Sequence, residues 1–202
     1  PNFQDLSSIQ GLAFLSDNKK LKVTGNGEPL TADEASEIHY PDYSVMRKGL
    51  EKFHGDGDAV NKFFGTIKDL EQIKEFFAQQ IYPDGLKFFK KSIGKKVAEI
   101  RSAQGCVARC TFCQRYIKGY RSYKIKDLES HVIELKEKYN VALLFLNDEN
   151  SLSNKKRSYE MAKVFKKHDM YWTAQGVRAN TCSYEDLKYY KEHNLLAVRY
   201  GI

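Results

Sequence analysis

The second half of the chain alternates between short apolar runs and amphipathic segments, and this alternation restricts the fold more than any other feature. The apolar runs have the length of strands and cover residues 97–102, 141–146, 171–177 and 195–200. Between them, residues 126–139 and 154–169 carry apolar side chains at helical spacing. A capping box from Ser183 to Asp186 opens a third predicted helix.

Strand–helix repeats joined by short links form parallel sheets with right-handed crossovers. Four such strands with no visible change in order predict an α/β fold, the first four strands of a partial (β/α) barrel over residues 96–202. The run 141–146 is apolar throughout, which predicts a strand buried on both faces. Barrels of this kind carry their chemistry on loops at the C-terminal ends of the strands.

The first half of the chain has a different character. Residues 1–42 contain two short alternating runs around a polar turn at 16–19, which predicts a β-hairpin. Residues 43–95 carry apolar side chains at roughly helical spacing and predict a mainly helical linker. The chain begins at Pro1 and ends at Ile202 inside a strand-like run. We therefore expect an internal piece of a longer protein, with residues 1–42 as the tail of an upstream domain.

Composition narrows the class of protein. Apolar residues make up 42% and charged residues 29%, a balance typical of soluble globular proteins. The longest apolar run, 141–146, is too short to span a bilayer, and no secretory h-region is present, so we expect a cytoplasmic protein with no membrane span. The net charge of +7 is spread along the chain, which favours solvated helix faces over a nucleic-acid partner.

Three of the four cysteines lie within eight residues, directly after the predicted strand at 97–102. Cys106, Cys110 and Cys113 have the spacing C-x3-C-x2-C. A disulfide framework would spread its cysteines along the chain. This crowding instead indicates a reducing compartment and a metal or cluster site.

The number of cysteines distinguishes the candidate metals. Structural zinc takes four ligands, usually from two separate C-x2-C pairs, and only Cys110 and Cys113 form such a pair here. Three cysteines can bind three irons of a 4Fe–4S cluster and leave the fourth iron open to an exchangeable ligand. The absence of a fourth cysteine from the motif therefore favours a catalytic role of the cluster over electron transfer alone. Zinc with the isolated Cys182 or a histidine as fourth ligand stays open as an alternative.

The motif resembles that of the radical S-adenosylmethionine superfamily, because C-x3-C-x2-C follows a strand and Phe112 precedes the last cysteine. The order of the later segments, residues 145–150, 172–178 and 198–202, is similar as well. The resemblance implies that the three cysteines bind a 4Fe–4S cluster. It also implies that the amino and carboxylate groups of S-adenosylmethionine chelate the open iron, with the Phe112 backbone beside the adenine.

Three further residues receive cofactor-binding roles from the resemblance. Residues 147–149 stand where the family has a Gly-Gly-Glu or acidic motif that meets the amino group of S-adenosylmethionine. The resemblance assigns this contact to Asp148, although the family's glycines are absent here. Arg178 would pair with the cofactor's carboxylate or with substrate, and Gly201 would start a segment near the ribose. Plain structural roles stay open for two of them, a helix-cap carboxylate for Asp148 and a surface ion pair for Arg178.

The activity implied by the resemblance is reductive cleavage of S-adenosylmethionine to a 5′-deoxyadenosyl radical, which abstracts hydrogen from a small-molecule substrate. The electron would come from an external donor of flavodoxin or ferredoxin type. Residues 9–14 and 41–43 are similar to the junction after the cobalamin-binding domain of cobalamin-dependent radical enzymes. That likeness implies cobalamin and a methyl transfer or rearrangement. The family's cobalamin motif, D-x-H-x-x-G, does not occur in this sequence and would lie upstream of Pro1.

Two rival functions stay open at this point. A tRNA methylthiotransferase would need a second cluster domain and a basic RNA-binding domain, and neither is visible in the sequence. A non-catalytic iron–sulfur or zinc-binding module would need only the cysteines. The substrate, the catalytic residues that would act on it and the reaction outcome do not follow from the sequence.

Overall fold

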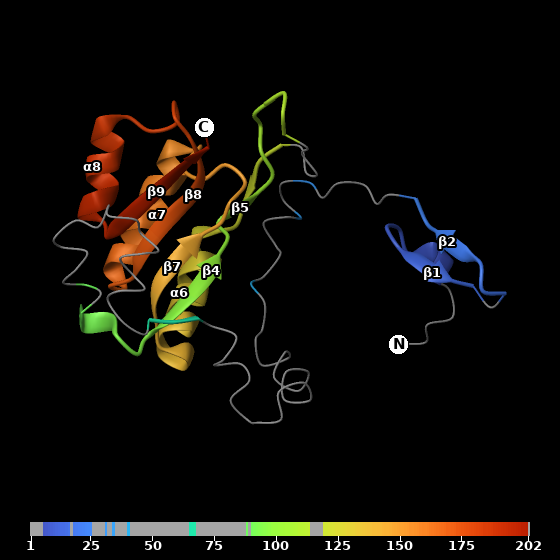
Figure 1. Ribbon diagram of the computed structural model, residues 1–202, viewed down its shortest axis with the longest axis horizontal. Coiled ribbons are helices and arrows are strands. Elements are labelled where there is room, and N and C mark those ends of the chain that lie inside the picture. Colours follow the sequence, from blue (N-terminus) through green and yellow to red (C-terminus); the bar gives the residue numbers. More distant parts are fainter. Residues whose placement is uncertain are drawn as a thin grey trace.

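The computed structural model describes residues 6–16, 18–25, 31, 34, 40, 65–67, 88, 90–113 and 119–201 (Figure 1). After a short 3₁₀ turn at Leu6–Ser8, strands β1 (Ala13–Leu15) and β2 (Leu21–Val23) form an antiparallel hairpin. Ala13 lies opposite Val23 in its register, so the predicted hairpin is confirmed.

In the described part of the chain, the main sheet has five strands in the order β3-β4-β7-β8-β9. They are β3 (Gly65–Thr66), β4 (Lys96–Ile100), β7 (Val141–Leu146), β8 (Tyr171–Arg178) and β9 (Leu195–Gly201). β3 pairs antiparallel with β4, and the other four strands are parallel to one another. The four predicted strands are therefore confirmed as consecutive parallel neighbours, while β3 was not predicted.

Each pair of consecutive parallel strands is joined by one helix: α6 (Ile125–Tyr139), α7 (Lys155–Lys167) and α8 (Tyr184–Glu192). α6 stops at Asn140, whose left-handed φ of 55° is tolerated better by asparagine than by most residues. The Asn154 side chain caps α7 by accepting from the Arg157 amide. The predicted Ser183–Asp186 capping box is present at the start of α8.

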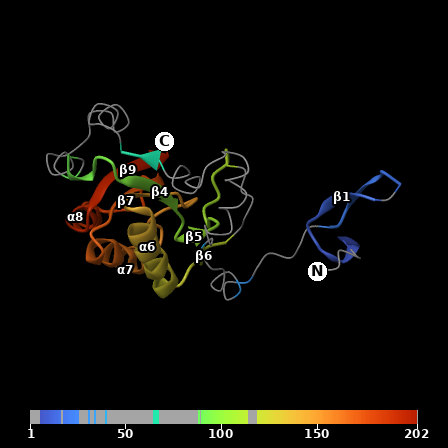
Figure 2. The ribbon, with the colours of Figure 1, turned by 90° about the horizontal axis from the view of Figure 1, so that it is seen from below.

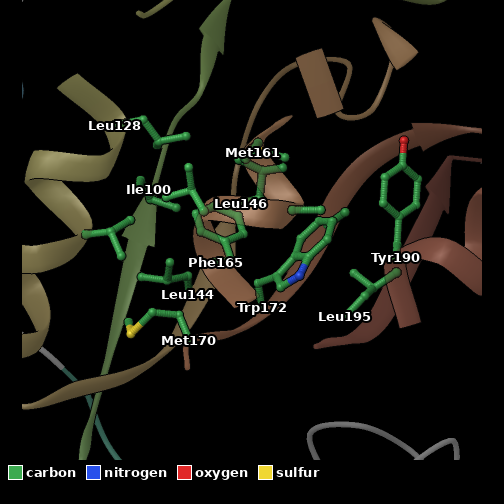
Figure 3. Packing of buried hydrophobic residues seen from close by; sticks show 14 of the residues in the cluster. Ile100, Leu128, Leu144, Leu146, Met161, Phe165, Met170, Trp172, Tyr190 and Leu195 are labelled. Carbon is green, nitrogen blue, oxygen red and sulfur yellow. The ribbon is translucent and has the colours of Figure 1, made fainter. Parts of the chain in front are cut away.

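The three helices cover the same face of the sheet (Figure 2). Their apolar sides meet the strands in one core, in which Trp172 contacts Phe165 with ring centroids 5.4 Å apart and Tyr190 at 5.8 Å (Figure 3). Trp172 is fully buried, and its indole N–H donates to the His193 carbonyl oxygen at 2.8 Å. This hydrogen bond satisfies the only polar group of the side chain.

The opposite face of the sheet carries a smaller apolar cluster. Ala142 and Leu143 of β7 pack there with Leu196 of β9. Ile67 and Phe88, which precede β4 in the sequence, belong to the same cluster. β7 is thus buried on both faces, as its continuous apolar sequence predicts.

The chain is α/β with a parallel sheet and helices, as predicted, and sequential strand order with helices on one face is compatible with part of a β/α barrel. The described strands form an open sheet, so the closed barrel stays a prediction. Most of the predicted helical linker at 43–95 lies outside the described residues. Within the described part, no helix is long and apolar enough to cross a membrane.

Candidate functional site

The cysteines lie on a loop whose two ends are tied together. We call residues 105–120 the cysteine loop; positions 105–113, 119 and 120 of it are described. Strands β5 (Ala103–Gln104) and β6 (Arg121–Ser122) pair antiparallel at its base. The Tyr123 amide donates to the Ser102 carbonyl oxygen at 3.0 Å, and the Gln104 side-chain amide donates to the Tyr123 hydroxyl at 2.7 Å. The loop therefore starts from a fixed base at the C-terminal end of β4.

The three thiols differ in exposure. Cys106 and Cys110 are half-buried, and Cys113 is exposed. The Ala108 amide donates to the Cys106 sulfur at 3.3 Å, so the first thiol is held by the backbone of its own loop. Gly105, directly before Cys106, has a φ of 78°, a conformation that residues with a Cβ rarely adopt.

Asp148 lies two residues after β7 and is hydrogen-bonded to the segment that leads from β4 into the cysteine loop. Its side chain is 5% exposed, and its Oδ1 accepts from the backbone amides of Ser102 at 2.7 Å and Ala103 at 3.1 Å. Its Oδ2 accepts from the Ser102 hydroxyl at 2.6 Å. Burial raises the pKa of Asp148 above its ordinary value, and these hydrogen bonds act in the opposite direction.

Gly176 of β8 supports the Asp148 segment from the neighbouring strand. A Cβ at this glycine would lie 2.9 Å from the Asp148 carbonyl oxygen and 3.2 Å from that of Glu149. Its φ is 65°, at an irregularity in the β8–β9 register between Ala174 and Val177. Only glycine combines this backbone conformation with so close an approach.

Tyr40 supports the same region from the N-terminal half of the chain. Its hydroxyl donates to the Arg101 carbonyl oxygen at 2.5 Å, one residue before Ser102. Its ring stacks on His131 of α6 with centroids 4.1 Å apart. Burial raises the pKa of the Tyr40 hydroxyl far above its ordinary value, so the hydroxyl stays a donor at every ordinary pH.

Two further predicted cofactor-binding residues, Arg178 and Gly201, lie at the same edge of the sheet, because the parallel strands all end there. Arg178 ends β8 and pairs in register with Gly201, which ends β9, and both are exposed. Glu149 follows Asp148 and is exposed. Phe112, on the cysteine loop, is 87% exposed. Asp148 is thus hydrogen-bonded at the base of the cysteine loop, and Arg178 pairs with Gly201 in the sheet. These are two separate sets of contacts.

The donor set fits an iron–sulfur cluster in its chemistry. All three cysteines are free of disulfides, and soft thiolates on one tethered loop are the ligands that such clusters take. Among the described residues, no three histidine, cysteine or acidic side chains converge as metal ligands. The loop would therefore have to draw its thiols together around the group.

Cys182 fits poorly as a fourth ligand. It is half-buried against the main core, beside Tyr190 and Asp186. Burial, with a smaller contribution from the Asp186 charge, raises the pKa of the Cys182 thiol to about 11. Zinc binds the thiolate, so the raised pKa makes Cys182 a poorer zinc ligand than an ordinary exposed cysteine.

Sequence reasoning missed Ser102, Gly176 and Tyr40 as parts of this region. Gly176 carried a usable signal, since an isolated glycine within a strand pattern indicates a bulge or a close backbone approach. Ser102 and Tyr40 carried none, because their roles depend on partners far away in the sequence, at Asp148 and Arg101.

Comparison with known proteins gives a partial likeness. No family model matches the chain. Over 89 residues, or 42% of its length, the chain is 26% identical to cytidylyl-2-hydroxyethylphosphonate methyltransferase of Streptomyces wedmorensis. The match covers 17% of that protein, so the chain corresponds to a small part of its relative. The likeness is compatible with an enzyme that transfers a methyl group.

Proposed function

We propose that the chain is the cluster-binding part of a radical S-adenosylmethionine enzyme that transfers a methyl group to a small molecule. The observation that carries the proposal is the cysteine loop itself. Cys106, Cys110 and Cys113 extend from the C-terminal end of a parallel strand, on a base held by β5, β6 and Asp148. The α/β architecture, in which such edges carry chemistry, supports it as well.

Cys106, Cys110 and Cys113 would bind a 4Fe–4S cluster, which when bound supplies the electron and the open iron for cleavage of S-adenosylmethionine. The chain's own residues would bind and orient S-adenosylmethionine. Phe112 is exposed on the loop and available to a ligand, and Arg178 is exposed at the same edge, where its guanidinium would pair with a carboxylate. Glu149 offers an exposed carboxylate to an amino group there.

Methyl transfer is supported by the likeness to a methyltransferase. Cobalamin is supported by the resemblance at residues 9–14 and 41–43, and it would be bound by a domain upstream of this chain. We propose a soluble, cytoplasmic enzyme with a flavodoxin or ferredoxin as electron donor.

Anaerobic reconstitution tests this proposal. The chain is loaded with iron and sulfide, reduced and given S-adenosylmethionine, and its iron content and released 5′-deoxyadenosine are measured. We expect about four irons per chain and release of 5′-deoxyadenosine. Each single change Cys106→Ala, Cys110→Ala or Cys113→Ala should abolish the release, whereas Cys182→Ala should leave it within about twofold, because Cys182 is half-buried against the core.

The outcome also separates the rival functions. Tight binding of one zinc per chain, with no iron cluster, would contradict the proposal and support a zinc module. A stable cluster that releases no 5′-deoxyadenosine under reducing conditions would support a non-catalytic iron–sulfur module.

A further inference from the structure

We propose that Asp148 is a positioning residue that holds the segment leading into the cysteine loop, and that it does not contact bound S-adenosylmethionine. This inference rests on the proposed function, since it concerns how the cluster loop is held. It differs from the role that the family resemblance implies for Asp148, which is contact with the amino group of the cofactor.

The hydrogen bonds of Asp148 are the first argument. A carboxylate accepts about four hydrogen bonds, and three of these acceptor positions are already used by the Ser102 amide, the Ser102 hydroxyl and the Ala103 amide. The side chain is 5% exposed, so a ligand ammonium would have to displace these donors to reach it. Losing them would leave buried amides unpaired, at a cost of about 1–3 kcal/mol for each.

The place of the contacts in the chain is the second argument. Ser102 and Ala103 lie between β4 and the cysteine loop, and Ala103 is also the first residue of β5. Two consecutive amides that point at one carboxylate oxygen fix the direction in which the backbone leaves the sheet. Cys106 follows Ala103 by three residues, so the direction set by Asp148 determines where the first thiol lies.

The support behind Asp148 is the third argument. Gly176 lets β8 approach the Asp148 and Glu149 carbonyl oxygens, so the backbone that carries the carboxylate has little room to shift. Glu149, by contrast, is exposed at the same edge of the sheet. Of the two neighbouring carboxylates, Glu149 is the one available to a cationic group of a ligand.

Two substitutions separate positioning from ligand contact. Asp148→Asn keeps an oxygen for the Ser102 and Ala103 amides, and its new NH₂ group can donate to the Ser102 hydroxyl oxygen. Asp148→Ala removes all three hydrogen bonds. If Asp148 positions the loop, the asparagine variant keeps its function and the alanine variant loses it; if Asp148 binds the amino group by charge, both variants lose it.

The experiment measures two properties of the full chain. In the cluster-free protein, hydrogen exchange reports the Ser102 and Ala103 amides. In the reconstituted protein, iron retained after gel filtration and the dissociation constant of S-adenosylmethionine are measured. We expect Asp148→Ala to speed exchange at both amides at least tenfold and to lower retained iron at least threefold, while Asp148→Asn stays within about threefold of wild type in every measurement. Asp169→Asn, an exposed carboxylate change at the other end of β8, is the matched control and should change nothing.

Two results would overturn the inference. One is an asparagine variant that retains its iron but binds S-adenosylmethionine more than tenfold more weakly, since that would reveal a charge contact with the ligand. The other is an alanine variant with unchanged amide exchange and iron. If the wild-type chain takes up no cluster, the proposed function fails, and the exchange data still decide whether Asp148 holds this segment.

Discussion

At the scale of single residues, Gly176 shows how a strand can restrict the loop beside it. The nearest atoms to a Cβ at this position are backbone oxygens, which cannot move aside as a flexible side chain could. Gly94 offers a matched comparison, because its φ of 84° is also positive while nothing lies within 4 Å of its would-be Cβ.

We therefore predict that Gly176→Ala destabilises the protein more than Gly94→Ala. Both variants pay about 1–2 kcal/mol for an alanine in the left-handed region. Gly176→Ala adds a steric cost of about 1–3 kcal/mol, because its Cβ would meet the Asp148 carbonyl oxygen at 2.9 Å. Denaturant unfolding of the two variants measures the difference, and equal losses would refute the close approach.

Asp186 is a second residue whose surroundings give a clear expectation. Burial would raise the pKa of Asp186, but hydrogen bonds from Lys155, Tyr159 and Ser183 outweigh it and hold the pKa well below its ordinary value of 3.8. The Lys155 ammonium lies 2.6 Å from the carboxylate. A carboxyl group with a lowered folded-state pKa stabilises the fold above its unfolded pKa and loses that contribution as the pH falls toward the folded value.

We predict that wild type melts at a higher temperature than Asp186→Asn at pH 7, and that the gap begins to shrink below about pH 4. Burial also lowers the pKa of His131 to about 4, so both proteins lose stability together as the pH falls below about 6.5. Only the gap between their melting temperatures therefore reports Asp186. A gap that stays constant or widens down to pH 3 would contradict the assignment.

At the scale of elements, sequence pattern predicted the long segments well. The periodicity at 154–169 predicted a helix, and the structure has α7 at Lys155–Lys167 with Asn154 as its N-cap. The apolar run at 141–146 coincides with β7. Burial on one face of a helix, or on both faces of a strand, leaves a pattern of apolar residues along the whole element. The sequence of the element itself is therefore enough to predict it.

The short elements could not be predicted in the same way. β3, β5 and β6 have two residues each, too few to show any period. They form because a partner strand far along the chain supplies their hydrogen bonds: β3 pairs with β4, and β5 pairs with β6 across the cysteine loop. β5 and β6 form the base of the cysteine loop, so the positions of the candidate site could be predicted from the sequence but its support could not.

The candidate site could likewise be predicted only in part from the sequence. The sequence alone placed the cysteines, Asp148, Arg178 and Gly201 at the C-terminal ends of parallel strands, and the structure has them at that edge. What Asp148 contacts was not predictable, because its donors lie 45 and 46 residues away along the chain. The roles of Phe112 and Arg178 toward a cofactor stay predictions.

At the scale of the whole molecule, the parallel sheet brings chemistry to one edge. β4, β7, β8 and β9 run in the same direction, so the loop with the thiols and the ends with Glu149 and Arg178 all emerge together. The apolar core behind them, between the sheet and the three helices, fixes those strands in place. We propose that the cysteine loop at this edge binds a cluster with one iron open to S-adenosylmethionine.

Electron paramagnetic resonance of the reconstituted, reduced chain tests that claim most directly. We predict the signal of a reduced 4Fe–4S cluster, with a shape that changes when S-adenosylmethionine is added, because the cofactor would bind the iron that has no cysteine ligand. S-adenosylhomocysteine, which lacks the sulfonium charge, serves as a comparison ligand. The claim would be contradicted by a cluster signal that S-adenosylmethionine leaves unchanged, or by a chain that binds no iron at all.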